Sequence, residues 1–392
     1  MKTRVLLILV SMMLIMGMFG GTMAAAPQTI KFGITIPITG ANALWADIVR
    51  HQTGMARDEI NAAGGILGRQ LEIIYEDNQS TVTGGIVAFQ KMMSEHPDMV
   101  AIGGMNFSNL VLGLMPYVTE EKIPCIVHGS NYAITRNNNG YMFRDYMNDD
   151  VGAEIATRFA FEKLGGKVAI ITNNNEMGMG GGDRAVAALL KYYNVKPTTR
   201  EIYNVGDKDF TAQLMKVAQS GATALVHWGH SVEAALIMRQ MSELGLNKKI
   251  ALIGSPDHSS SATLDLAKET ANGVYTVTTY DPMSSNPKNK AYVERFQKLW
   301  NLMPDAHAGM YDGIYILKAA IEKVGAKGLE GITKEVRQRI TDAMFGITYQ
   351  GVVANYTVAK SGDMLWDYII IQITDGPKYV TKVVQSFHTD PK

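Results

Sequence analysis

Residues 229–233, with the sequence Gly-His-Ser-Val-Glu, come closest to a catalytic motif. The nucleophile elbow of hydrolases places its serine between two glycines, because the strand-to-helix turn that carries the serine is sharp and strained. Here Glu233 replaces the second glycine. The run therefore does not predict a nucleophilic serine.

A glycine-rich run at residues 178–183, Gly-Met-Gly-Gly-Gly-Asp, follows a predicted strand and looks like a dinucleotide-binding loop. Asp183 occupies the third glycine position of that motif, and its carboxylate would repel a pyrophosphate. No phosphate-binding loop with lysine followed by serine or threonine occurs in the chain. We therefore expect no nucleotide cofactor.

The eight histidines and the single cysteine do not form a recognisable metal site. Zinc motifs pair cysteines or histidines at short spacings, and the histidines here are scattered. Cys125 has apolar neighbours on both sides, so we interpret it as a core residue and not as a nucleophile. Together these observations predict a protein with no metal, no cofactor and no enzymatic activity.

The charge of the chain is balanced, with 37 lysines and arginines against 37 aspartates and glutamates. A surface that binds nucleic acid needs clustered positive charge, and no basic block stands out. We therefore expect no nucleic-acid partner. At 392 residues the chain is too long for one ordinary core and suits two domains.

The first 26 residues have the composition of a secretory signal peptide. Lys2 and Arg4 precede an apolar run at residues 5–19, and small residues follow at 20–26. A retained membrane anchor is the alternative, but it needs about 20 apolar residues. No cysteine lies near the cleavage site to carry a lipid. We expect cleavage within the alanines at 24–26 and a soluble, exported protein.

Apolar patterns over residues 31–104 predict alternating strands and helices. Val49, Ala56 and Ile60 lie seven and four residues apart, which places them on one face of a helix. Strands that alternate with helices form a parallel sheet, which binds ligands beyond the carboxyl ends of its strands. The predicted strands of this unit are residues 31–37, 71–75 and 99–102, and its second helix spans 82–93.

The second half repeats this pattern, which predicts two lobes with one sheet each. After a strand at 124–128 and an extended segment at 141–144, the next strands are expected at 168–172, 201–205, 224–228 and 250–254. The helices between them begin at Val151, Arg184, Thr211 and Ser231.

From Gly273 the order of elements changes. A strand at 274–278 precedes helices at 291–301, 308–324 and 333–343, which need a sheet to cover. We therefore expect the chain to return to the first lobe near Thr278 and to leave it again between 346 and 351, where antiparallel runs begin. The predicted N-terminal lobe comprises residues 27–147 and 279–349, and the C-terminal lobe comprises 148–278 and 350–392.

Several strings in the chain resemble type I periplasmic binding proteins, in particular the leucine/isoleucine/valine-binding receptors of ABC importers. The most specific is residues 58–68, where a helix end, a double-glycine turn and a strand entry follow one another in a fixed order. The resemblance covers nearly the whole mature chain. The other matching strings are residues 33–40, 75–77, 102–103, 177–178, 207–210, 239–246 and 311–312.

This resemblance implies an α/β fold of two Rossmann-like lobes with parallel sheets, joined by a three-strand hinge, with a small ligand buried between the lobes. A ligand that touches both lobes binds the closed form more tightly and shifts the hinge equilibrium by that difference in affinity. It further implies delivery of the ligand to an ABC permease in the membrane. We expect a monomer in the periplasm.

The resemblance also implies ligand contacts from the N-terminal lobe. Trp45 stands where relatives place an aromatic ring against the ligand, which we favour over the alternative of a helix-capping core residue. Relatives bind the ligand carboxylate with a hydroxyl and backbone amides after the third strand, where this chain has Asn106, Phe107 and Ser108. Phe107 replaces the usual serine, which favours an aromatic or bulkier ligand as the alternative.

Six further residues match ligand-binding positions of the family. Ser130 and Asn131 align with a pair that contacts the ligand through oxygen atoms, with turn residues as the alternative. Asp150 aligns with a hinge aspartate or caps the following helix. The remaining three are Met177 and His230, which replace common aromatic residues, and Asp257, which aligns with the acidic partner of a ligand ammonium group.

These positions predict a ligand of the branched-chain amino acid type or a related small carboxylate. An aromatic acid or an amide is the alternative, because Trp45 and Phe107 would supply flat apolar walls. A soluble sensor that hands its ligand to a membrane receptor would share the same features.

Overall fold

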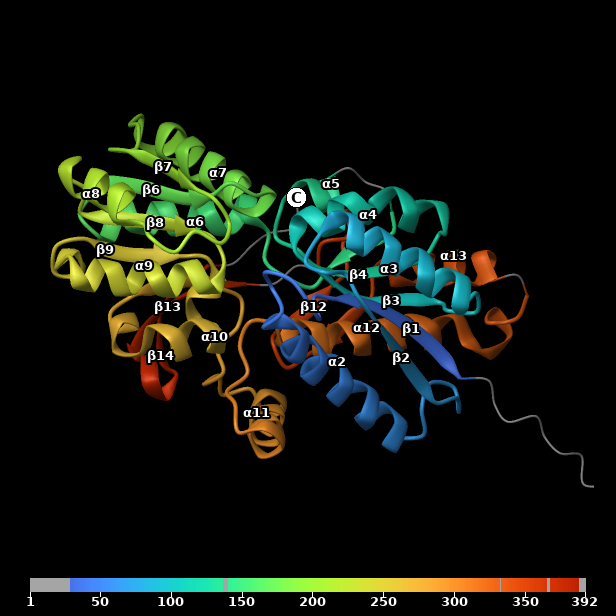
Figure 1. Cartoon of the computed structure of the whole chain (residues 1–392). Coiled ribbons are helices and arrows are strands. Elements are labelled where there is room, and N and C mark those ends of the chain that lie inside the picture. Colours follow the sequence, from blue (N-terminus) through green and yellow to red (C-terminus); the bar gives the residue numbers. More distant parts are fainter. Residues whose placement is uncertain (1–28, 137–139, 332, 365–366, 388–392) are drawn as a thin grey trace, which may run out of the picture.

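The computed structural model describes residues 29–136, 140–331, 333–364 and 367–387. The predicted signal peptide therefore lies outside the described residues. Figure 1 shows two lobes side by side, each built around a sheet that is covered by helices. The α/β fold with two largely parallel sheets confirms the predicted fold class.

The first sheet has five parallel strands in the order β2-β1-β3-β4-β5. Helices α2 and α12 share one core cluster on one face of this sheet, and α3 and α4 share another. The strands are β1 (Ile30–Ile36), β2 (Leu71–Asp77), β3 (Ala101–Asn106), β4 (Cys125–His128) and β5 (Met142–Arg144). The helices are α2 (Trp45–Ala62), α3 (Val82–Glu95), α4 (Ser108–Glu120), α5 (Ala133–Arg136), α11 (Pro287–Trp300), α12 (Ala308–Gly328) and α13 (Thr333–Met344).

The second sheet has seven strands in the order β14-β13-β10-β9-β8-β6-β7, of which β13 and β14 are antiparallel. Its strands are β6 (Val168–Asn173), β7 (Arg200–Tyr203), β8 (Ala224–Trp228), β9 (Ala251–Gly254), β10 (Tyr275–Thr278), β13 (Tyr368–Asp375) and β14 (Val380–Phe387). Its main helices are α6 (Asp149–Lys163), α7 (Glu176–Tyr193), α8 (Thr211–Gln219), α9 (Ser231–Glu243) and α10 (Ser261–Ala267). Across the described ranges, no helix has the length and apolarity needed to cross a membrane.

The alternation of side chains along β8 shows how this sheet is buried on both faces. Val226 and Trp228 join the core cluster that contains α6 and α7, whereas Leu225 joins the cluster that contains α8 and α9. Successive side chains of a strand point to opposite faces, so a strand covered on both sides is expected to be largely apolar. Four of the five residues of β8 are apolar, and the exception, His227, is buried with its ring nitrogens 2.8 Å from the Tyr203 hydroxyl and 2.9 Å from His258 Nε2.

The glycine-rich run at 178–182 lies inside α7 and not in a loop, because the helix begins at Glu176. The side chain of Asn175 caps it by accepting a hydrogen bond from the Gly178 N–H at 3.0 Å. A Cβ atom at Gly181 would lie 2.1 Å from Cδ1 of Trp228. The run therefore serves close packing of α7 on β8, which explains its resemblance to a dinucleotide motif.

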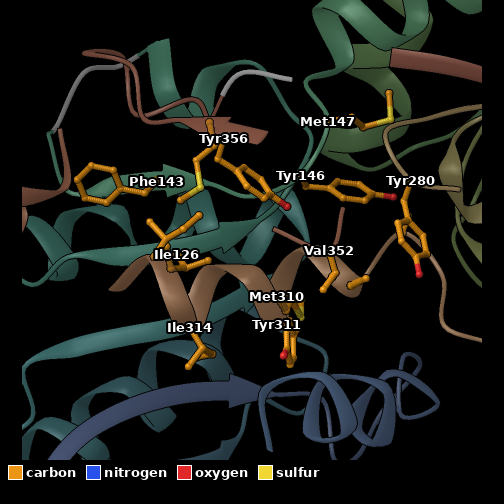
Figure 2. Packing of buried hydrophobic residues seen from close by; sticks show 14 of the residues in the cluster. Ile126, Phe143, Tyr146, Met147, Tyr280, Met310, Tyr311, Ile314, Val352 and Tyr356 are labelled. Carbon is orange, nitrogen blue, oxygen red and sulfur yellow. The ribbon is translucent and has the colours of Figure 1, made fainter. Parts of the chain in front are cut away.

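The third crossing between the lobes lies later in the chain than expected. The hairpin of β11 (Thr348–Gln350) and β12 (Asn355–Thr357) still packs on α12, where Asp312 accepts hydrogen bonds from the Val352 N–H at 2.9 Å and the Tyr356 hydroxyl at 3.0 Å. Figure 2 shows Val352 close to the α12 residues Met310 and Tyr311. Only from Tyr368 does the chain join the second sheet. Residues 350–364 thus lie with the N-terminal lobe, in contrast to the predicted boundary at 349.

Cys125 is fully buried in β4, and this burial raises the pKa of its thiol well above the ordinary value. A thiol that is held protonated is a poor nucleophile. The structure confirms that Cys125 is a core residue.

Candidate ligand-binding cleft

The carboxyl ends of strands from both sheets face a common pocket, as expected for parallel α/β sheets. The first sheet contributes the ends of β3, β4 and β5, and the second contributes the ends of β8 and β9 and the first turn of α7. The pocket contains about 370 Å³ of space between atoms, including space open to solvent. It is lined by Trp45, Asn106, Phe107, Ser108, His128, Gly129, Ser130, Tyr146, Met177, His230, Asp257 and His307.

Eight of the ten predicted site residues therefore line this pocket. Asn131 and Asp150 do not. The residues that sequence reasoning missed are His128, Gly129, Tyr146 and His307. Three of these four follow the same positional rule that identified the others, because His128 and Gly129 end β4 and Tyr146 follows β5. His307 directly precedes α12, a place for which the strand-end rule gave no signal.

Phe107 lies at the N-terminus of α4 and contacts both lobes. Its backbone φ of 64° is unusual for a residue with a side chain and directs the chain from β3 into the helix. The Phe107 ring meets the Trp45 ring edge to face at 6.1 Å between centroids, and the His230 ring of the other lobe at 5.6 Å. An aromatic wall thus spans both sides of the pocket.

Arg144 holds the loop after β4 in place through hydrogen bonds to its backbone carbonyls. Its Nη1 donates to the carbonyl oxygens of Gly129, Ser130 and Asn131 at 3.2, 2.8 and 2.9 Å, and its Nε pairs with Asp363 at 2.7 Å. The Ser130 carbonyl also accepts from the Asp149 N–H at 2.8 Å. The resemblance implies that a backbone carbonyl at this position contacts the ligand. In this protein the Ser130 carbonyl already accepts two hydrogen bonds, from Arg144 and from the Asp149 N–H.

Asn131 lies beside the pocket and joins the two lobes. Its N–H donates to Ser108 Oγ at 3.1 Å, and its side-chain oxygen accepts from the Ala133 N–H at 2.9 Å. Its Nδ2 donates to the Glu176 carbonyl at 2.7 Å, across to α7. Each of these groups thus has a partner within the protein, and Asn131 bridges the two lobes.

Asp150 lies in an ion-pair cluster outside the pocket. Its carboxylate pairs with Arg184 at 2.5 Å and with Arg136 at 2.6 Å. The cap of α6 is Asn148, whose side chain accepts from the Asp150 N–H at 2.9 Å. Asp150 therefore neither faces the ligand space nor caps the helix, and its charge is neutralised by one guanidinium from each lobe.

Two further imidazoles line the pocket and are each held by an aspartate. His128 Nδ1 lies 2.8 Å from Asp145, and His307 Nδ1 lies 2.7 Å from Asp305. Burial and the His307 charge lower the pKa of His128 well below its ordinary value. The His128 and His307 rings are tilted by 38° to each other, with centroids 4.8 Å apart. Despite these imidazoles, the described part of the chain holds no group of three residues arranged to bind a metal ion.

His230 and Asp257 belong to a chain of hydrogen bonds on the other side of the pocket. Asn175 Nδ2 lies 2.7 Å from His230 Nε2, and His230 Nδ1 lies 3.4 Å from Asp257 Oδ2. The Tyr146 hydroxyl reaches Asp257 Oδ1 at 3.4 Å from the first lobe. Both contacts to Asp257 are long, so its carboxylate can still accept a stronger partner.

The comparison with known proteins agrees with this arrangement. A family model described as periplasmic binding protein matches residues 29–377. The chain is 27% identical over 323 residues to a Leu/Ile/Val-binding protein homolog of Brucella suis, covering 82% of this chain and 85% of the relative. It is 26% identical over 353 residues to the leucine-, isoleucine-, valine-, threonine- and alanine-binding protein of Pseudomonas aeruginosa, covering 90% of this chain and 91% of the relative.

Solved structures show the same fold. A branched-chain amino acid transporter substrate-binding protein from Streptococcus pneumoniae, in complex with isoleucine, has a TM-score of 0.79 at 20% identity and covers 93% of this chain and 100% of its own. A solute-binding protein from Rhodopseudomonas palustris, in complex with 3,4-dihydroxybenzoic acid, has a TM-score of 0.80 at 21% identity and covers 92% and 97%. With its pocket between two lobes and a family match along nearly all of its length, the chain belongs to the periplasmic binding protein family.

Proposed function

We propose that this protein is the extracytoplasmic receptor of an ABC importer, and that it closes its lobes over a small amino acid and presents the closed form to a membrane permease. The observation that carries this proposal is the pocket itself, whose wall comes from strand ends of both sheets. A ligand that contacts both lobes stabilises the closed arrangement by its differential affinity. Such a receptor acts as a monomer in the periplasm and changes no covalent bond.

Two observations favour an amino acid. Asp257 offers a carboxylate with only long contacts, which suits a ligand ammonium group. The relative from Pseudomonas aeruginosa is named for the amino acids that it binds, and the Streptococcus pneumoniae structure holds isoleucine. We extend this ligand class to the present chain.

An aromatic acid is the second candidate, favoured by the ring wall of Trp45 and Phe107. The Rhodopseudomonas palustris protein of the same fold holds such an acid. Flat rings pack well against edge-to-face aromatic walls. The two candidates differ in charge, because one carries an ammonium group and the other does not.

A thermal-shift screen tests the proposal. Bound ligand is first removed by dialysis of the mature protein in mild denaturant, followed by refolding. The protein is then heated in the presence of single compounds. These are the amino acids leucine, isoleucine, valine, threonine, alanine and phenylalanine, and a set of benzoic acids. We expect at least one aliphatic amino acid to raise the melting temperature in a concentration-dependent way, since a ligand at about 100 times its Kd adds roughly 2.7 kcal/mol of stability. If benzoic acids stabilise the protein and the amino acids do not, the amino-acid assignment is wrong. No shift with any compound would count against the receptor function.

A further inference from the structure

The first lobe gives the pocket a polar wall. Asn106 ends β3 and His128 ends β4, and the two residues are register partners on these neighbouring parallel strands. Register partners point to the same face of a parallel sheet, so the carboxamide of Asn106 and the imidazole of His128 lie side by side. Both residues line the pocket and are only 4% and 5% exposed. An apolar ligand side chain against this wall would cover two buried polar groups.

The Asn106 carboxamide does not hold the protein together. Its Oδ1 is buried and has no hydrogen-bond partner among the described residues. Asn131 shows the contrast, because its side chain donates to the Glu176 carbonyl and accepts from the Ala133 N–H. Buried polar atoms are normally satisfied, so the Asn106 oxygen calls for an N–H or O–H donor from the bound molecule.

The His128 imidazole supplies a donor beside this acceptor. Its Nδ1 lies 2.8 Å from Asp145 Oδ1, whereas its Nε2 is buried with no partner in the described structure. Burial raises the pKa of Asp145 well above its ordinary value and lowers the pKa of His128 well below its own. The carboxyl of Asp145 is therefore protonated and donates to Nδ1, and the neutral ring carries its single proton on Nε2.

A donor next to an acceptor is matched by a neutral group that both accepts and donates. A ligand carboxylate at this wall would meet the Asn106 oxygen, and a ligand ammonium group would meet the His128 N–H. Each would leave one of the two atoms without a partner, which is costly in a buried site. Sites built to hydrogen-bond a polar group also discriminate against the apolar isostere, because their own polar atoms then lose a partner.

Tyr146 connects this polar wall with the acidic side of the pocket. Its ring centroid lies 4.0 Å from that of His128, and its hydroxyl lies 3.4 Å from Asp257 Oδ1. The wall and Asp257 are thus separated by little more than one phenol ring. An amino acid with its ammonium group at Asp257 needs only a short side chain to reach Asn106 and His128.

Resting on the proposed receptor function, these observations deepen it: we infer that the pocket selects an amino acid with a short, neutral side chain that both donates and accepts hydrogen bonds, a carboxamide or a hydroxyl. The side chain donates to Asn106 Oδ1 and accepts from His128 Nε2. Asparagine, glutamine and threonine belong to this class, whereas the branched aliphatic amino acids bind more weakly.

Matched ligand series test this inference by calorimetric titration of the refolded mature protein. The first series is asparagine, leucine and aspartate, whose side chains have nearly the same shape and differ in the end group. The second is glutamine, methionine and glutamate, and the third is threonine and valine. In at least one series we expect the neutral polar member to bind at least about tenfold more tightly than the others, a difference of about 1.4 kcal/mol.

The remaining outcomes overturn the inference in two distinguishable ways. If binding is seen but the neutral polar member is less than tenfold ahead in every series, the inference is wrong and the receptor function stands. No binding by any of these compounds contradicts the inference and counts against the amino-acid receptor as well.

A variant of Asn106 adds a second test. Asn106→Leu keeps the shape of the side chain and removes the acceptor, so we expect the preference for the neutral polar member over the apolar one to fall by about tenfold or more. Binding of the apolar member should be retained. Asn109→Leu makes the same change on α4, at a residue that does not line the pocket, and should keep the preference within about twofold. An Asn106→Leu protein with an unaltered circular dichroism spectrum and an unaltered preference would contradict the inference.

Discussion

Replacing Asp257 with asparagine is expected to weaken the binding of an amino acid by about 30-fold or more, which corresponds to about 2 kcal/mol. The substitution keeps the size of the side chain but removes the charge opposite the ligand ammonium group. Asp257 is 5% exposed, so solvent screens its charge little. Calorimetric titration of the variant with the ligand found by the thermal-shift screen measures the loss.

The control for this prediction is Asp47→Asn. Asp47 lies on α2 close to Trp45, but its side chain is 78% exposed and does not line the pocket. We expect this variant to bind within about twofold of the unmodified protein, because exposed charges contribute little. Equal affinities for the Asp257 and Asp47 variants would place Asp257 outside the ligand contacts.

Asp149 is expected to contribute less and less to stability as the pH rises from 5 to 8. Burial raises the pKa of Asp149 from 3.8 to about 7, although Oδ1 accepts the Trp228 Nε1–H at 2.7 Å. Its other oxygen has no partner in the described structure. The folded state therefore binds more protons than the unfolded chain between these two pKa values. The resulting stability is complete below pH 3.8 and is lost as the pH rises through 7.

Asp149→Asn isolates this effect, because the amide oxygen can still accept from Trp228 and the side chain no longer ionises. Relative to the variant, the unmodified protein should lose roughly 3 kcal/mol of unfolding free energy between pH 5 and pH 8. Urea unfolding of both proteins at the two pH values measures the difference. Parallel changes in the two proteins would show that Asp149 keeps an ordinary pKa in the fold.

Much of the fold followed from local patterns in the sequence. The largely apolar composition of β8 fits a strand that is covered on both faces, and its bounds were predicted correctly as Ala224–Trp228. The predicted third crossing between the lobes comes too early in the chain. The strand pattern at residues 352–359 does not indicate which of the two sheets this segment packs with. What holds this segment on the first lobe is Asp312, a contact partner 40 residues away in the chain that no local pattern reveals.

The candidate site residues that could be predicted from the sequence are those that lie near the end of a strand. His230 lies two residues after the end of β8 and Asp257 three residues after the end of β9, and both line the pocket. Asp150 has the right type and place in the chain, but two arginines distant in sequence turn it away from the ligand space. His307 enters the pocket from the start of α12, and the packing of α12 against α2 within the first lobe brings it beside Trp45, at 4.2 Å between ring centroids.

Small-angle X-ray scattering, recorded with and without a saturating ligand from the thermal-shift screen, tests most directly whether this protein works by closing two lobes on a guest. We expect the radius of gyration to decrease on addition of the ligand, and the scattering curve to approach the one calculated from the structure, in which Asn131 and Glu176 bridge the lobes. Identical curves in the two states, with binding confirmed by calorimetry, would contradict the account.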